Sequence, residues 1–545
     1  MLQRTPPSRR LELLVYALLM AGSYVLAYDG NLDGNLDFYH EGDRLAHIDA
    51  LFDGKLPFRD IYVQQGFGEN ILKPALACKL FGTSVESLRR LGQNSYIYRG
   101  YLPPLGLVAT VLAAVVLLRR PGLVAGVCLL LLLSLYEVTE RHAFGFLSIA
   151  CLAAFIQSRR RWWLVLAGVM GSLAAIYSLE VGLFVMAAGI GWILLDARLR
   201  FASVRAFSAE VVRRGLPFVV GVLLGFAPFF LWCLSEGIVG DFVSNVHTQL
   251  FMRGEVAPAP YPLPTWLPHM PVGENSLFAA VILLIYYGIP CTYIAALLLI
   301  VYRRRHIRAK SASRILLTSL LGLFFWSSVV FRPDFWHVAY VVGPFILFLA
   351  TCLDVLPHII RNGRLRWTVL TIQVLTIFAL IWLGQRGAVG RMLLGQESAM
   401  LHDDLKRHGK TLAPCGLNRV GHIGIEEGRA GFITTVVAYI QSHTDADDTI
   451  LDLSDHALLY FLCKRKSPTR FHLLSHVGNT RLRDQLVTEV LSRERLPRYV
   501  IRIAGNVPSP DALGALVQTH YVPERRIGYL ELLRCVDLYG HRHAR

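Results

Sequence analysis

The side chains best suited to chemistry gather between residues 37 and 82, just after the first hydrophobic run. The segment reads DFYHEGDRLAHIDALFDGKLPFRDIYVQQGFGENILKPALACKLFG, with carboxylates interspersed among imidazole and guanidinium groups. On a helix that begins near Tyr39, Asp37 and Glu41 share one face. Close carboxylates push their pKa values apart, which leaves one of them available as a general base. We therefore select Asp37, Glu41 and Asp43 as candidate catalytic residues, with His40 as a substrate-binding neighbour.

The same spacing also fits a structural interpretation. Asp37 would cap the helix at its N-terminus, and Glu41 would lie in the first turn. Both interpretations can hold at once, and the spacing does not decide between them.

A second set of polar residues follows in the same segment. Arg59 and Asp60 form either a structural ion pair or, with Arg59 as a planar fork, part of a phosphate site. Gln65, Glu69 and Lys73 are polar positions on an otherwise apolar stretch. This pattern predicts a helix at the membrane interface whose polar face is turned towards a substrate site.

A third set lies at the outer ends of later hydrophobic runs. Glu180 interrupts the sequence IYSLEVGLF, and FRPDFWHVAY contains Arg332, Asp334 and His337. Titratable groups at this depth of a membrane are usually functional, so all four are candidate substrate-binding residues, although Arg332 and Asp334 could simply satisfy one another. The sequence contains no CxxC or HExxH pattern, and the DGNL repeat before Asp37 lacks the spacing of a calcium loop. No metal ligand and no specific cofactor is predicted, and a divalent metal ion stays open.

The composition indicates a membrane protein. Of the 545 residues, 54% are hydrophobic and only 17% are charged, whereas soluble domains have about 25% charged residues. Apolar runs recur at 11–28, 101–118, 123–136, 142–157, 162–178, 181–195, 216–234, 277–301, 314–331, 338–355 and 367–385. Because a span needs roughly 20 apolar residues, we predict a polytopic α-helical protein with about eleven transmembrane helices.

The distribution of basic residues predicts the orientation. With a cytoplasmic N-terminus, the inside segments are rich in Lys and Arg, whereas the short outside segments hold only Arg141, Arg253 and Arg332. The net charge of +16 is therefore mainly a signal of orientation, and its spread along the chain argues against nucleic acid as a partner. We expect four parts: the tail and first span (1–28), an outer loop with interfacial helices and the site (29–100), spans two to eleven (101–385), and an outer C-terminal domain (386–545).

The C-terminal domain is predicted to be a small α/β domain. Thr434–Ser442, HALLYFLCKR and PDALGALVQTH have helical patterns, whereas TILDLS, YVIRIAG and RRIGYLELLRCV are typical of strands. Cys415, Cys463 and Cys535 would lie outside, where a disulfide is permitted but no spacing demands one.

The motifs together resemble the C-type glycosyltransferases, the membrane superfamily of protein O-mannosyltransferases, oligosaccharyltransferases and lipid A aminoarabinose transferases. The resemblance is to a bacterial branch with an acidic-aromatic-HEG pattern after the first span, here at 37–43. Further matches are GKLPFRD at 54–60, LFG at 80–82, SLEVG at 178–182, and an R-x-D-x-x-H pattern formed by Arg332, Asp334 and His337. This chain departs from the commonest Asp-Glu pair by having His40-Glu41, so the resemblance does not identify the base among Asp37, Glu41 and Asp43.

The resemblance implies an enzyme of the bacterial inner membrane whose catalytic carboxylate lies in the first periplasmic loop. Its donor would be a sugar on polyprenyl phosphate, and its acceptor a lipid, glycan or protein. The carboxylate would deprotonate the acceptor hydroxyl while Arg59 or Arg332 neutralises the departing phosphate, with inversion at the sugar carbon. Two other classes stay open: a transporter or flippase of a lipid-linked saccharide, and a non-catalytic assembly subunit.

Overall fold

The computed structural model describes most of the chain. The described residues are 6–28, 30–95, 97–118, 120–134, 139–251, 284–303, 307–331, 335–355, 371, 375, 411–478, 480–506 and 511–536. Contacts divide the chain into two compact units. The first, which we call the helical unit, comprises Met1–Tyr28, Leu102–Phe229 and Ala259–Glu397. The second, which we call the mixed unit, comprises Asp29–Tyr101, Phe230–Pro258 and Ser398–Arg545.

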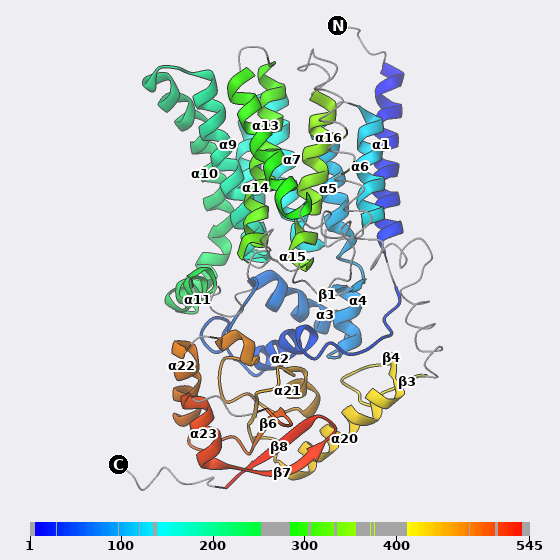
Figure 1. Ribbon diagram of the computed structural model, residues 1–545, viewed down its shortest axis with the longest axis vertical. Coiled ribbons are helices and arrows are strands. Elements are labelled where there is room, and N and C mark those ends of the chain that lie inside the picture. Colours follow the sequence, from blue (N-terminus) through cyan, green and yellow to red (C-terminus); the bar gives the residue numbers. More distant parts are fainter. Residues whose placement is uncertain are drawn as a thin grey trace. The chain divides into compact units, whose positions relative to one another are not determined.

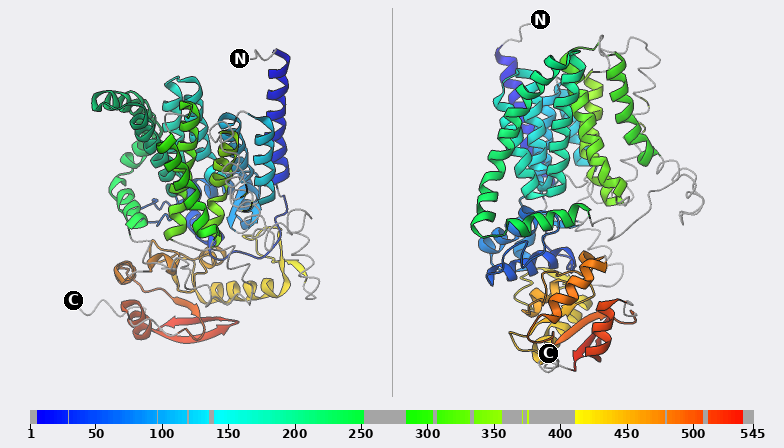
Figure 2. Two further views of the ribbon diagram at one scale, coloured as in Figure 1. Left: turned by 45° about the horizontal axis from the view of Figure 1, so that its top comes forward. Right: turned by 90° about the vertical axis from the view of Figure 1, so that its left-hand side faces the viewer.

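The helical unit is a group of apolar helices that run side by side (Figures 1 and 2). They are α1 (Pro6–Ala27), α5 (Pro104–Leu117), α6 (Pro121–Ser134), α7 (Glu140–Ser158), α8 (Trp162–Tyr177), α9 (Leu179–Arg200), most of α10 (Val204–Ser235), η4 (Leu284–Gly288), α13 (Ile289–Arg303), α14 (Ala309–Phe331), α15 (Phe335–Tyr340) and α16 (Val342–Val355). In its described residues, each hydrophobic run predicted up to residue 355 coincides with one or two of these helices, so the helical character of the runs is confirmed there. The run at 367–385 lies outside the described residues apart from 371 and 375.

The lengths of these helices fit a membrane protein without fixing the number of spans. Within the described residues, four helices are long and apolar enough to cross a membrane: Leu179–Arg200, Val204–Ser235, Ile285–Arg303 and Ala309–Val330. Five shorter apolar helices accompany them. The core is formed largely by contacts of α7 with α5, α8 and α9, and of α14 with α9, α13 and α16.

In the mixed unit, residues 40–92 form short helices, as predicted for this segment. They are α2 (His40–Phe52), the π-helix η1 (Gly68–Leu72), α3 (Lys73–Phe81) and α4 (Val85–Gly92), and a hairpin of β1 (Gln93–Ser95) and β2 (Ile97–Arg99) follows. The helix α11 (Val239–Phe251) also belongs to this unit.

The C-terminal residues of the mixed unit form the expected α/β arrangement. The sheet has the order β5 (Ile450–Asp452), β6 (Tyr499–Ile503), β8 (Leu530–Cys535) and β7 (Tyr521–Ile527). The β5 and β6 strands are parallel, whereas β8 pairs antiparallel with both β6 and β7. Its helices are α20 (Glu427–His443), α21 (Leu458–Cys463), α22 (Thr480–Leu491) and α23 (Ala512–His520). The sequence reading omitted α22 and the small pair β3 (Leu412–Pro414) and β4 (Gly424–Glu426).

The segment at 36–88 and the C-terminal residues of the mixed unit share one core. The backbone N–H of Leu458 donates to the carbonyl of Phe38 at 3.1 Å. Gly42 packs so closely on α21 that an added Cβ would lie 2.2 Å from the nitrogen of Leu458. The glycine of the HEG motif is thus required by helix packing, and it holds the N-terminal half of α2 against the C-terminal fold.

Candidate active site

Asp37 caps the N-terminus of α2. Its Oδ1 accepts hydrogen bonds from the backbone N–H groups of Tyr39 at 3.1 Å and His40 at 2.8 Å. Glu41 completes the arrangement, because its Oε2 accepts the backbone N–H of Asp37 at 2.8 Å. The two carboxylates therefore lie close together, and the capping interpretation of their spacing is correct.

The second oxygen of Asp37 engages His40. Oδ2 lies 2.8 Å from Nδ1 of His40. The side chains of His40 and Asp37 are 27% and 17% exposed, respectively. This partly exposed pair has the geometry of a candidate base and the imidazole that orients it.

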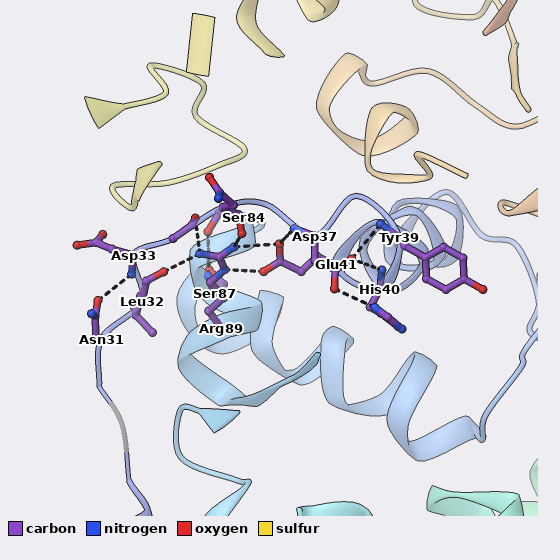
Figure 3. A network of polar contacts seen from close by, with 12 residues as sticks. Asn31, Leu32, Asp33, Asp37, Tyr39, His40, Glu41, Ser84, Ser87 and Arg89 are labelled. Atoms are coloured by element: carbon purple, nitrogen blue, oxygen red, sulfur yellow. Dashed lines mark hydrogen bonds and ion pairs between the residues drawn. The ribbon is translucent and has the colours of Figure 1, made fainter. Parts of the chain in front are cut away.

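Glu41 is held in a buried ion pair with Arg89 of α4 (Figure 3). Nε of Arg89 donates to Oε1 at 2.5 Å, and Nη2 donates to Oε2 at 3.1 Å. The same guanidinium also donates to the carbonyls of Leu32 at 2.7 Å, Gly34 at 3.1 Å and Asn35 at 2.8 Å. Through this bidentate pair, Glu41 helps to hold the segment before α2 in place. Because the pair is closed to solvent, Glu41 is poorly placed to take a proton from a substrate.

Asp43 is buried on another part of α2. Its Oδ2 accepts a hydrogen bond from Nδ2 of Asn70 at 3.1 Å, and its Oδ1 lies 3.2 Å from Nε2 of His47. Burial alone would raise the pKa of this carboxyl, but the surrounding imidazoles of His47, His476 and His472 outweigh it and hold the pKa below its usual range. An anion of low basicity is suited to orienting an imidazole and is a weak general base.

Three histidines that the sequence reading did not select surround Asp43. His47, His472 and His476 are all buried, and the rings of His47 and His472 are 5.0 Å apart. Burial, reinforced by the positive field of His47, lowers the pKa of His472 to about 3. Next to this cluster along α2, Arg44 forms a buried ion pair with Glu69 of η1, at 2.9 Å between Nη2 and Oε1.

The next two candidates, Arg59 and Asp60, contact different partners. Arg59 and Asp60 do not pair with each other, which corrects the structural alternative above. Arg59 donates from Nε to Asp241 of α11 at 3.1 Å and from Nη2 to the carbonyl of Gly237 at 2.6 Å. Asp60 accepts the backbone N–H of Leu56 at 3.0 Å and so closes a turn.

Gln65 and Lys73 flank η1. The backbone N–H of Gln65 donates to Oδ1 of Asn70 at 3.3 Å, and Lys73 is buried at the start of α3. Together with the buried Glu69 and Asn70, these placements show that the polar positions of this stretch face the interior of the mixed unit. The sequence predicted a helix at the membrane interface with this polar face turned towards a substrate site. In the structure Glu69 and Lys73 are built into a packed core, and the substrate site stays a prediction.

The helical unit has a separate polar cluster at the start of α7. Glu140, Arg141 and His142 are consecutive and all buried. Nη1 of Arg141 donates to the hydroxyl of Tyr340 at 2.7 Å, and Nη2 donates to Oγ of Ser178 at 3.3 Å. The cluster was missed because Arg141 was read only as an orientation signal, although three titratable residues at the start of an apolar run were a usable indication.

Two predicted residues of the helical unit lie near the partners of Arg141: His337 is close to Tyr340 in space, and Glu180 is close to Ser178 in sequence. His337 is buried, and its ring lies 5.7 Å from that of Tyr340. Glu180 is in the first turn of α9, two residues after Ser178. In the same SLEVG motif, Gly182 meets α8 so closely that an added Cβ would be 2.2 Å from the Cα of Ala175. Arg332 and Asp334 lie outside the described residues.

Metal and disulfide chemistry find little support in the described residues. Among them, no three His, Cys, Asp or Glu side chains are grouped closely enough to hold a metal ion. All nine cysteines are free, and Cys415, Cys463 and Cys535 are buried.

Comparison with known proteins adds two solved structures. No family model and no curated protein matches the chain. The crystal structure of ArnT from Cupriavidus metallidurans in the apo state matches 97% of this chain and 98% of its own, with 14% identity and a TM-score of 0.45. The oligosaccharyltransferase of Archaeoglobus fulgidus, in complex with Zn and sulfate, matches 90% of this chain and 68% of its own, with 12% identity and a TM-score of 0.47.

Both structures are of the kind that the sequence motifs resemble. At such identities and TM-scores, neither similarity says what this chain binds or transforms.

Proposed function

We propose that the chain is a membrane glycosyltransferase that uses Asp37 as its general base. The observation that carries the proposal is the difference between the three candidate carboxylates. Glu41 is held in a closed ion pair with Arg89, and Asp43 is buried with a lowered pKa. Asp37 is partly exposed and hydrogen-bonded to His40, so its carboxylate is the one of the three within reach of a substrate.

The donor is a sugar linked to polyprenyl phosphate, and the acceptor is a hydroxyl-bearing lipid, glycan or protein. Asp37 takes the proton of the acceptor hydroxyl while the acceptor oxygen forms a bond to the anomeric carbon. The bond from that carbon to the phosphate oxygen breaks, and the phosphate leaves with the electron pair, so the configuration inverts. His40 holds Asp37 in position through its Nδ1 bond, which is 2.8 Å long.

Departure of the phosphate requires a cation. Arg59 and Arg332 were predicted for this role, and Arg332 lies outside the described residues. Arg59 is 43% exposed, and it donates to Asp241 and to the carbonyl of Gly237. A planar guanidinium stabilises developing negative charge. Arg59 therefore keeps the role of binding the lipid phosphate.

The topology is part of the same proposal. The asymmetry of Lys and Arg supports a cytoplasmic N-terminus in the bacterial inner membrane and a periplasmic position for 29–100 and 386–545. Transfer on the periplasmic side accounts for the embedding of the enzyme, because the polyprenyl chain of the donor stays in the bilayer.

Measuring the release of polyprenyl phosphate distinguishes the proposed transferase from a transporter. The full-length protein in lipid vesicles is incubated with a polyprenyl-phosphate sugar and a membrane extract as acceptor, and free polyprenyl phosphate is measured. A transferase releases it only when acceptor is present. Movement of intact donor across the vesicle bilayer, without release of polyprenyl phosphate, would identify a flippase and refute the proposal. The absence of both would leave the assembly-subunit class.

A further inference from the structure

A cavity of about 720 Å³ lies within the mixed unit, apart from the Asp37–His40 pair. Its walls come from the second half of α2, the turn at 55–60, the segment 464–470 and the end of α22. We call it the basic cavity, because eight Lys or Arg residues and only four Asp or Glu residues line it. Its volume is within the range of sites for small ligands, roughly 300–1,000 Å³.

The carboxylates of the basic cavity are already engaged. Asp49 pairs with Arg419, Asp53 lies 3.3 Å from Nζ of Lys466, and Glu489 lies 3.4 Å from Nε of Arg470. The fourth carboxylate, Asp60, closes the turn at Leu56. The acidic residues thus neutralise some of the cations and leave an excess of positive charge.

Two lysines contribute to that excess. Within the part of the chain that the structure describes, Lys55 and Lys464 line the cavity without a carboxylate within ion-pair distance. Arg493 donates from Nε to the carbonyl of Pro468 at 2.8 Å, so its charge is also uncompensated by an acid. Exposed cations around a concave surface attract anionic ligands.

The backbone beside these cations is strained. Lys464 ends α21 in the left-handed region at φ 53°, where glycine or asparagine is usual. Phe58, directly before Arg59, has φ 70°. Among the described residues, only two other non-glycine residues, Arg159 and Asp455, have a positive φ. Strain of this kind is retained mainly at ligand sites, which indicates that the side chain of Lys464 is needed at this position.

We propose that the basic cavity binds an anionic saccharide, through phosphate or carboxylate groups carried by the glycan acceptor. This inference rests on the proposed glycosyltransferase function and specifies its acceptor. Lys55, from the turn at 55–60, and Lys464, from the end of α21, supply charge-assisted hydrogen bonds. A neutral saccharide of the same length lacks these bonds and binds more weakly.

The test measures equilibrium binding to the full-length protein in phosphatidylcholine nanodiscs, without donor. The probes are a fluorescent phosphorylated maltotetraose and its unphosphorylated parent. We expect the phosphorylated probe to bind at least about tenfold more tightly, since one charged hydrogen bond contributes about that factor. Lys55→Gln and Lys464→Gln should each remove about tenfold of the affinity. Lys79→Gln, at an exposed lysine of α3 outside the cavity, should leave affinity unchanged.

Lys464→Gly separates binding from folding. Glycine relieves the left-handed backbone, so thermal stability should be unchanged or higher while affinity falls. Equal affinity for both probes, or unchanged affinity in the lysine variants, would overturn the proposal. Lysine-dependent binding of a short-chain phosphatidylglycerol without binding of the phosphorylated saccharide would also overturn it, by assigning the cavity to lipid headgroups.

The binding result is independent of the transfer result. Asp37→Asn should bind the phosphorylated probe normally although it does not transfer sugar. A failure of binding in a protein that still transfers sugar refutes the cavity's role alone, whereas loss of transfer in the wild-type protein refutes the proposed function.

Discussion

The carboxylate of Glu41 and the guanidinium of Arg89 form a two-bonded ion pair in which the side chains are 0% and 3% exposed. The remaining donors of Arg89 hold the chain at Leu32, Gly34 and Asn35, immediately before the cap residue Asp37. Glu41 therefore positions the segment that carries Asp37. Glu41 has a structural role, whereas Asp37 is the proposed base.

Glu41→Gln should destabilise the mixed unit. The change leaves the Arg89 charge buried without its partner, which costs about 3–5 kcal/mol of folding free energy. Thermal unfolding of the full-length protein measures the loss. The control is Asp53→Asn, which removes an ion pair whose side chains are both about half exposed and should cost less than about 1 kcal/mol. Equal effects of the two changes would contradict a structural role for Glu41.

Gly42→Ala should disrupt the packing of α2 on α21. The new methyl group would lie 2.2 Å from the backbone nitrogen of Leu458, so the two helices must separate. We expect a loss of about 1–3 kcal/mol or more, measured as increased proteolysis of residues 411–536. Gly428→Ala in α20 is the matched control, because no atom lies within 4 Å of its added Cβ. A neutral Gly42→Ala would show that α2 does not depend on this close approach.

The mixed unit should lose stability in acid through His472. Burial holds the pKa of this imidazole at about 3, whereas an unfolded histidine takes up a proton near pH 6.5. The stability contribution is complete above pH 6.5 and falls by about 1.4 kcal/mol per pH unit between 6.5 and 3. The lowered pKa of Asp43 acts in the same direction at lower pH.

Pulse proteolysis at pH 7.5 and 4.5 measures this dependence. His472→Gln should flatten the pH dependence, whereas His443→Gln, at an exposed position of α20, should leave it as in the wild type. The same change of stability with pH in the wild type and both variants would exclude His472 as the cause of the acid sensitivity.

Arg59→Lys should impair transfer. Lysine keeps the charge but loses the planar fork that reaches Asp241 and the carbonyl of Gly237. We expect turnover to fall by about 10²–10³-fold, as for other groups that stabilise developing charge, measured as release of polyprenyl phosphate. Arg161→Lys, at an exposed position before α8, is the control and should transfer normally. Normal turnover in Arg59→Lys would remove Arg59 from the phosphate role.

Sequence reasoning succeeded where the signal is local. The hydrophobic runs predicted the helices, and the strand-like stretches predicted β5, β6, β8 and the last three residues of β7, because length and periodicity act within one element. The capping of α2 by Asp37 was also available, since it involves residues only three and four positions apart.

The site could not be assembled from the sequence where its contacts are distant. Arg89 is 48 residues from Glu41, and Arg59 is 182 residues from Asp241. No spacing rule connects such pairs, and only the folded core brings His472 beside His47. The cluster at Glu140, Arg141 and His142 is different, because its three adjacent titratable residues are visible in the sequence, but only Arg141 was considered, as a signal of orientation.

The measurement that tests the central claim most directly is the turnover of Asp37→Asn. Asparagine caps a helix as well as aspartate does, so α2 should remain folded and thermal stability should be unchanged. The amide cannot accept the acceptor's proton, and turnover should fall by about 10²–10⁴-fold. Asp484→Asn, at an exposed position of α22, is the matched control and should retain wild-type turnover. Folded Asp37→Asn protein with wild-type turnover would contradict the assignment of Asp37 as the base.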